Sequence, residues 1–417
     1  MNDWKRIPFR LAKLAADIRD SYWAVPAILA LAGLISGLLL VWADVRIGTE
    51  WLSGTGLLHG SRPEGARAML STIAGSTITV AGVVFSVTLA AVTYAAGQHG
   101  PRLLTNFARD KGNQVTLGIF IGTYVYCLVV LRTVRSASET GRANDYFVPQ
   151  IAVYAALGLA LASIAMLIYF VHHVTQTIHI NNVIARIGES LVAEVRENAV
   201  KEAALGVAGR SVASGAAGVS IVSKRAGYVQ GIDYAALAAL ADAQDVRAMV
   251  DCRPGDFIDS GRTLITIHAE AAQRDGDHQK WRTPFTIGSR KTDLQDLQFG
   301  FDELNEIATR ALSPGINDPF TAIACIDWMG AALSEYDRAM LEVTADPPPS
   351  RIAVVARNFD DYLGASFGRL RQHAIADASV TAVAARTLAG LAATANRADH
   401  RSALHRERAL YLNGSSG

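Results

Sequence analysis

Four long apolar segments in the first half of the chain limit its possible folds more than any other feature. They cover residues 24–41, 68–97, 115–131 and 151–171. A helix needs about 20 predominantly apolar residues to cross the hydrocarbon core of a bilayer. The second segment is longer than that, so it is expected to tilt or protrude. One such segment would suit a buried helix of a soluble protein, but four in succession predict a transmembrane domain over residues 1–175.

The distribution of lysine and arginine predicts which side of the membrane the termini face. Five such side chains precede the first segment and three lie between the second and third, against six in the other two connections. Because cytoplasmic loops are enriched in Lys and Arg, both termini are predicted to be cytoplasmic. Three widely spaced cysteines, with no CxxC motif, fit a reducing compartment and indicate neither a disulfide framework nor a zinc site.

The second half of the chain reads as three further regions. Residues 176–214 are predicted to form an exit helix and a Gly/Ala/Ser linker, residues 215–292 a small β-rich module, and residues 293–417 a helical domain. The order GY…RPGDFI…G…L is similar to the barrel-sandwich fold of lipoyl and biotinyl carriers, but their modified lysine is missing. The predicted fold is therefore a four-helix membrane protein with a cytoplasmic α+β region, made of a barrel-sandwich-like β module and a helical bundle.

Several quoted stretches together resemble a known family. They are RALSPGINDPFTA, the region from GSTITVAGVVFSVTLAAVTYAAGQHG to GIFIGTYVYCLVVLR, IHINNVIARI and RPGDFI. This combination is similar to the bacterial predicted membrane proteins of the domain of unknown function 2254 type. The resemblance implies a multi-pass protein of the bacterial inner (plasma) membrane with a cytoplasmic C-terminal region. It implies no activity and no catalytic residue.

A stripe of hydroxyl side chains marks the second apolar segment. Thr72, Thr79, Ser86 and Thr93 recur every seven residues, so they lie close to one helix face. One interpretation is close packing between helices, because small residues let backbones approach. The other is the lining of a pore, which would require several copies of the chain, since four helices seldom enclose a channel. The hydroxyl stripe therefore predicts either a helix contact or a pore.

Composition argues against several other classes of function. A net charge of +1 disfavours a nucleic-acid binder. The apolar segments carry no Asp, Glu, Lys or Arg, whereas ion-coupled carriers usually have a charged residue there. No phosphate-binding loop, nucleophile elbow, zinc-protease or dinucleotide motif is present. No catalytic residue and no cofactor is predicted, and an enzyme is the less favoured class.

The stretch around Pro314 and Gly315 predicts a break between two helices. Asp318 before Pro319 is a typical helix start, because the Asp side chain accepts from free backbone amides and Pro suits the first helical position. A purely structural turn is the favoured interpretation. The alternative is a polar ligand site formed by Arg310, Asn317 and Asp318, since a helix N-terminus beside an arginine suits an anion or a carbonyl-rich ligand.

Histidines gather near the ends of the second and fourth segments. His99 follows the second, and His172 and His173 end the fourth. Imidazole is a common ligand of transition metals. Hydration at the membrane surface or pH sensing is nevertheless the favoured interpretation of this group over a metal site.

Two hypotheses of function follow. The first is a homo-oligomeric ion channel or pore with a cytoplasmic regulatory domain, whose partners are the lipid bilayer and small ions. The second is a non-conducting, membrane-anchored protein that binds or senses an unknown small ligand.

Overall fold

A computed structural model describes residues 21–47, 62–99, 110–135, 147–177, 179–209, 218–268, 278–342 and 351–414. The chain divides into two compact units, Met1–His179 and Ile180–Gly417. Each unit is described below by itself. Residues 210–217 of the predicted linker before the β module lie outside the described residues, whereas its first residues, up to Gly209, are helical.

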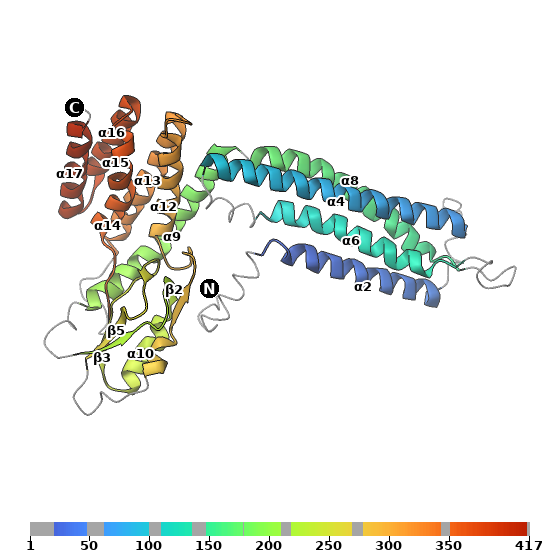
Figure 1. Cartoon of the computed structure of the whole chain (residues 1–417), viewed down its shortest axis with the longest axis horizontal. Coiled ribbons are helices and arrows are strands. Elements are labelled where there is room, and N and C mark those ends of the chain that lie inside the picture. Colours follow the sequence, from blue (N-terminus) through green and yellow to red (C-terminus); the bar gives the residue numbers. More distant parts are fainter. Residues whose placement is uncertain are drawn as a thin grey trace. The chain divides into compact units, whose positions relative to one another are not determined.

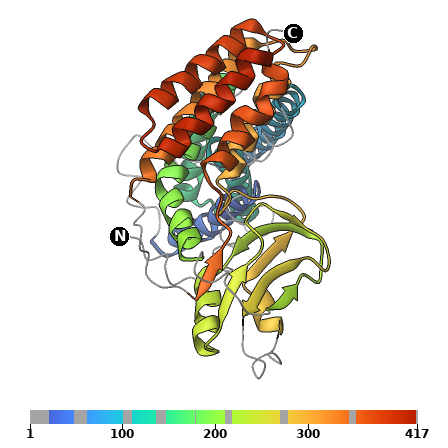
Figure 2. The same ribbon diagram turned by 90° about the vertical axis from the view of Figure 1, so that its left-hand side faces the viewer.

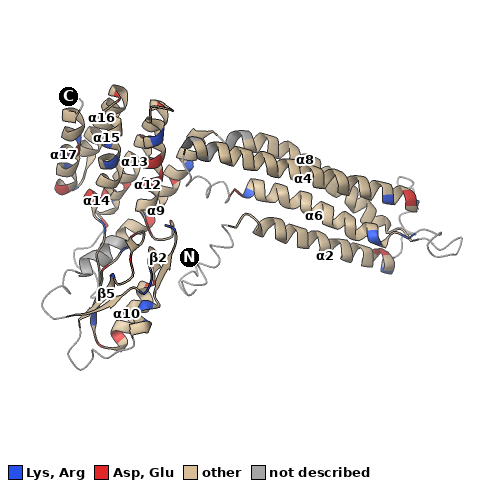
Figure 3. Ribbon diagram, in the orientation of Figure 1, with Lys and Arg blue, Asp and Glu red and all other residues tan. Residues whose placement is uncertain are grey.

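The first unit contains the four predicted apolar helices. They are α2 (Ala24–Ile47), α4 (Pro63–His99), α6 (Lys111–Thr133) and α8 (Gln150–Thr177), and all four are long and apolar enough to cross a membrane. Figure 1 shows them running side by side, and Figure 3 shows that their charged residues lie at their ends. With 37 residues, α4 is longer than the hydrocarbon core requires, as expected from the sequence.

Glycines bring α2 and α6 into close contact. Both helices carry two glycines four residues apart, Gly33 and Gly37 in α2 and Gly118 and Gly122 in α6. A Cβ atom on Gly122 would lie 2.8 Å from the carbonyl oxygen of Leu29, and one on Gly33 would collide with the carbonyl of Gly122. The two backbones therefore touch directly, which is the packing that such glycine pairs permit in membranes.

Polar side chains fasten one end of this bundle. The carboxylate of Asp44, at the end of α2, accepts hydrogen bonds from the backbone amides of Ile151 and Ala152 at 3.0 Å each. Arg67 of α4 donates to the carbonyl oxygen of Val134, which follows α6. Negative charge is favourable at a helix N-terminus and positive charge at a C-terminus, so both contacts stabilise the helix ends that they touch.

Apolar side chains fill the space between the four helices. Leu70, Tyr126, Cys127 and Val130 are almost completely buried, and the Tyr126 hydroxyl donates to the carbonyl of Ala152 at 2.8 Å. These residues form one continuous cluster of α4, α6 and α8 side chains. One copy of the chain therefore forms a solid bundle rather than a tube in the part that the structure describes.

The second unit begins with the predicted exit helix, which forms part of its core. The helices are α9 (Ile180–Gly209), α10 (Tyr234–Ala243), α11 (His278–Arg282), α12 (Gln298–Ala311), α13 (Pro319–Ala339), α14 (Phe359–Leu363), a π-helix (Gly364–Gly368), α15 (Arg369–Ala374), α16 (Ala378–Thr394) and α17 (Ala398–Gly414). Val183, Ile187 and Leu191 of α9 are buried against α12 and α13. Gly188 leaves room for the ring of Trp328, which a Cβ would strike.

Two small sheets make up the β-rich part of this unit. One has the strand order β1 (Val219–Val222), β5 (Thr263–His268), β3 (Arg247–Val250), β7 (Ile352–Val354), and the other β4 (Phe257–Ile258), β2 (Gly227–Ile232), β6 (Phe285–Gly288). Neither sheet closes into a barrel, so the barrel-sandwich part of the prediction is not confirmed. Strand β7 pairs in parallel with β3, although it comes from the region predicted to be helical. Figure 2 shows the strands gathered apart from the last helices of the chain.

Candidate functional site

The hydroxyl stripe of α4 faces away from the other three helices. Thr72, Thr79, Ser86 and Thr93 are all exposed. The first three donate to the carbonyl four residues earlier in their own helix, at 2.8, 2.8 and 2.9 Å, rather than across to a neighbour. Among the described residues, the stripe therefore does not pack against another helix of the same chain.

Two glycines on this side of α4 leave open space beside the hydroxyls. A Cβ added to Gly75 or Gly82 would have no atom of the described chain within 4 Å. Small residues on a membrane helix favour close approach of another helix. The outer face of α4, defined here by Thr72, Gly75, Thr79, Gly82 and Ser86, thus combines self-bonded hydroxyls with room for a neighbour.

The predicted break between helices lies between α12 and α13. Asp318 caps α13, since its side chain accepts from the Thr321 amide at 3.2 Å and the Thr321 hydroxyl at 2.6 Å, and Pro319 follows in the first helical position. Asn317 is exposed and has a positive φ of 49°. Arg310 lies in the last turn of α12. The capping role predicted for Asp318 is confirmed, whereas a ligand at these three residues stays a prediction.

The predicted histidine group is spread over different surroundings. The side chain of His99 lies outside the described residues, and His172 is exposed. His173 contacts Asp110 through Nε2, at 2.9 and 3.0 Å from the two carboxylate oxygens, and its ring stacks on Tyr169. Within the described ranges, no three His, Cys, Asp or Glu side chains are grouped in a way that could hold a metal ion.

Asp110 is a buried carboxylate that sequence reasoning missed. It caps α6 by accepting from the amides of Gly112 and Asn113 at 2.8 and 3.4 Å. The His173 ring lies so close to Gly112 that a Cβ there would be 2.5 Å from Nε2. The available signal was Asp110 followed by Lys-Gly-Asn at a helix start, but the apolar segment begins only at Val115.

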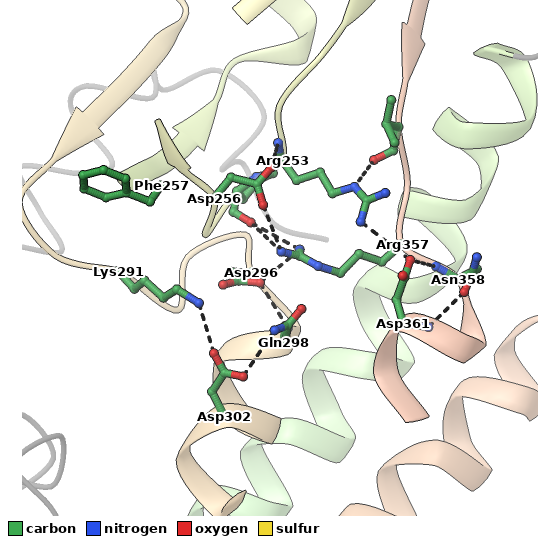
Figure 4. A network of polar contacts seen from close by, with 12 residues as sticks. Arg253, Asp256, Phe257, Lys291, Asp296, Gln298, Asp302, Arg357, Asn358 and Asp361 are labelled. Carbon is green, nitrogen blue, oxygen red and sulfur yellow. Dashed lines mark hydrogen bonds and ion pairs between the residues drawn. The ribbon is translucent and has the colours of Figure 1, made fainter. Parts of the chain in front are cut away.

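A network of charged side chains joins the strands of the second unit to its helices (Figure 4). Arg357, which follows β7, donates to the carbonyl of Pro254 through both terminal nitrogens at 3.2 Å and pairs with Asp296 at 3.1 Å. Arg253 donates to the carbonyl of Val355 at 2.8 Å. Gly255 has a positive φ of 87°, and a side chain there would collide with Asp296. The RPGDFI motif therefore forms a tight loop that two arginines hold in place.

Burial governs the charge state of Asp296. Its side chain is 1% exposed, and that burial raises its pKa to about 6, although Arg357 and Lys291 act in the opposite direction. Oδ2 of Asp296 has no hydrogen-bond partner among the described residues. Lys291 itself pairs with Asp302 at 3.0 Å. Burying the Asp296–Arg357 pair costs desolvation energy that the attraction between the two charges does not fully offset.

A second buried pair lies among the last helices. Nδ1 of His400 lies 2.6 Å from Asp337, whose other oxygen accepts from the backbone and side-chain nitrogens of Asn396 at 2.8 Å each. Burial by itself would raise the pKa of Asp337, but these hydrogen bonds outweigh it and hold the pKa below its ordinary value. Phe359 stacks on the His400 ring. The pair fixes the start of α17 against α13.

The four apolar helices, followed by a compact α/β unit held by internal ion pairs, define a multi-pass helical membrane protein. A family model described as "Predicted membrane protein (DUF2254)" matches residues 19–390, so the chain belongs to this family. The resemblance noted in the sequence is thereby confirmed.

Curated relatives occur in mycobacteria. Uncharacterised proteins of Mycobacterium bovis and Mycobacterium tuberculosis are each 32% identical to this chain over 325 residues. The match covers 76% of this chain and 60% of each relative, so the chain spans less than two thirds of their length. No solved structure matches the chain.

Proposed function

We propose that this protein is a homo-oligomeric ion channel of the bacterial inner membrane, in which the outer face of α4 meets other copies and lines or borders the path. The observation that carries the proposal is the direction of that face. Its hydroxyls and open glycines point away from the bundle of their own chain. A second copy of α4 would cover this surface, which is polar compared with a helix surface that faces lipid.

The solid interior of the bundle supports the need for several copies. Tyr126, Cys127 and Val130 occupy the space between the helices of one chain. A path for ions must then run between chains rather than within one. Hydroxyls without charges suit weak selectivity, and an apolar ring at Phe85 is the candidate gate in this proposal, because Phe85 is exposed whereas the neighbouring Val84 is buried inside its own bundle.

The second unit is proposed to be cytoplasmic and regulatory. The five Lys and Arg residues before α2 support an N-terminus on the cytoplasmic side. Four membrane crossings would return the chain to that side before α9. The two cysteines of the second unit, Cys252 and Cys325, are free, which fits a reducing compartment.

Ion flux through liposomes containing the purified full-length protein tests the proposal. Gly82→Leu fills the open space on α4, so we expect it to reduce potassium flux by at least about tenfold, because steric occlusion of a narrow path removes conduction. Gly158→Leu is the matched control, since Gly158 lies in α8 and also has open space around it. Absence of flux in the wild type under any ion, voltage or tension would contradict the channel, as would equal flux in the two variants.

The alternative is a non-conducting, membrane-anchored sensor. The turn before α13 favours it, since Asn317 in that turn and Phe320, the second residue of α13, are exposed, Phe320 by 81%. A screen of metabolites and nucleotides for thermal stabilisation of the full-length protein distinguishes the two functions. A stabilising ligand whose effect is lost in Asn317→Ala, together with an absence of flux, would favour the sensor.

A further inference from the structure

Three membrane helices and the turn before the fourth contribute to a polar cluster at one end of the bundle. Tyr22 lies two residues before α2, Thr88 belongs to α4, Asp110 caps α6 and Asn113 lies in its first turn, and His173 lies near the end of α8. Tyr22 lies beside Thr88 and within electrostatic range of Asp110. This concentration of polar groups is unusual in a membrane bundle, where buried ionisable residues commonly mark a functional site.

Oδ1 of Asn113 is buried and has no hydrogen-bond partner among the residues that the structure describes. The Tyr22 hydroxyl is also buried, and its polar neighbour is Thr88. Asn113 is only 3% exposed. Leaving a buried polar atom unpaired is costly, and such atoms commonly mark a bound water or ion.

Both groups lie toward the same part of the bundle. Tyr22 packs on the apolar cluster that contains Val84, Leu117 and Phe170. Asn113 lies four residues before Leu117, hence on the same face of α6. The backbone amide of Asn113 also reaches the carboxylate of Asp110.

The chemistry of the cluster indicates which ligand it would bind. Asp110 and Oδ1 of Asn113 can only accept. Thr88 has already given its proton to the carbonyl of Val84 at 2.8 Å, so it offers lone pairs, and Tyr22 can do the same. Oxygen donors of this kind are preferred by hard cations. One carboxylate matches the charge of a monovalent cation, and the positive end of the α6 dipole opposes a higher charge.

We propose that Tyr22, Thr88, Asp110 and Asn113 form a binding site for a monovalent alkali cation at this end of the bundle. His173 contacts both oxygens of the same carboxylate, so the cation competes with His173 for Asp110. Binding therefore loosens the link between α6 and the last turns of α8. The site does not depend on conduction, since a non-conducting protein can carry it equally well.

Thermal unfolding of the full-length protein in detergent tests this site. Sodium or potassium chloride is titrated against N-methylglucamine chloride at equal ionic strength, because a ligand that binds only the folded state raises the midpoint saturably. We expect a saturable rise with at least one alkali cation and none with N-methylglucamine. Tyr22→Phe and Asn113→Ala should each shift the half-saturating concentration upward, and Asp110→Asn should abolish the rise.

Asp44→Asn is the matched control for these variants. Asp44 is also a buried aspartate that caps a helix of the bundle, but both of its oxygens accept from backbone amides. Asp44→Asn should lower the midpoint of thermal unfolding without added cation, and its midpoint should still rise with the alkali cation. Identical curves for alkali and N-methylglucamine salts would overturn the proposal, as would an unchanged response in both Tyr22→Phe and Asn113→Ala, because water alone would then fill the cluster.

Discussion

Replacing Gly122 by leucine is expected to separate α2 from α6 and to prevent the membrane unit from folding correctly. Overpacking costs about 1–3 kcal/mol where neighbouring side chains can move. Here the obstacle is the backbone carbonyl of Leu29, only 2.8 Å from the position of a Cβ atom, so one helix must shift as a whole. We expect a cost at or above the upper end of that range. In size-exclusion chromatography of the detergent-solubilised protein, we expect the variant to lose the monodisperse peak of the wild type.

The control for this substitution is Gly158→Leu in α8. A side chain at Gly158 meets no atom of the described chain within 4 Å, so this variant should elute as the wild type does. If Gly122→Leu also eluted as a sharp, stable peak, the close contact between α2 and α6 would be contradicted.

Replacing Arg357 by alanine is expected to destabilise the second unit by about 3–5 kcal/mol, the cost of leaving a buried charge without its partner. Asp296 would lose the guanidinium at 3.1 Å, and the carbonyl of Pro254 would lose two donors. The urea midpoint of the full-length protein, followed by tryptophan fluorescence to which the buried Trp281 contributes, measures the loss. Since a domain is stable by only about 5–15 kcal/mol, the shift should be large.

The loss caused by Arg357→Ala should depend on pH. The pKa of Asp296 is raised to about 6, so below pH 6 the carboxyl is protonated in the folded protein and needs no cationic partner. Arg357 lowers this pKa, so Arg357→Ala raises it further, and the stability difference between the wild type and the variant grows above pH 6, where only the wild type pairs the charged carboxylate. We therefore expect a larger destabilisation at pH 8 than at pH 5.

Arg351→Ala provides the matched control for Arg357→Ala. Arg351 also pairs with two aspartates, Asp242 and Asp245, but its side chain is 41% exposed and theirs are more exposed still. Exposed ion pairs contribute about 0–1 kcal/mol, so the urea midpoint should barely move. Equal shifts for the two arginines would contradict the buried role of Arg357.

Local patterns in the sequence predicted much of the architecture. Long apolar runs identified four spans because lipid leaves a helix few alternatives. The cap at Asp318 and the strands around RPGDFI also followed from local chemistry. The four-residue spacing of Gly33 and Gly37, and of Gly118 and Gly122, is a sequence signal for close helix packing. Only the structure shows that these glycines of α2 and α6 face each other.

The candidate sites were less predictable, because they depend on residues far apart in the chain. The seven-residue spacing placed Thr72, Thr79, Ser86 and Thr93 on one face, but not the direction in which that face points. Asp110 lies 63 residues from His173, and Arg357 lies 61 residues from Asp296 and 103 from Pro254. Such pairs are set by tertiary packing, for which one sequence holds no local signal.

Cysteine cross-linking at Thr79 in native membranes tests most directly whether the outer face of α4 meets another copy. The three native cysteines are buried, so a new exposed cysteine should dominate the reaction. We predict that Thr79→Cys gives cross-linked dimers under mild oxidation. Leu161→Cys is the control, because Leu161 lies on α8 and is 62% exposed, and it should give no dimers. A chain that stays monomeric with Thr79→Cys, or that cross-links equally at both positions, would contradict the account.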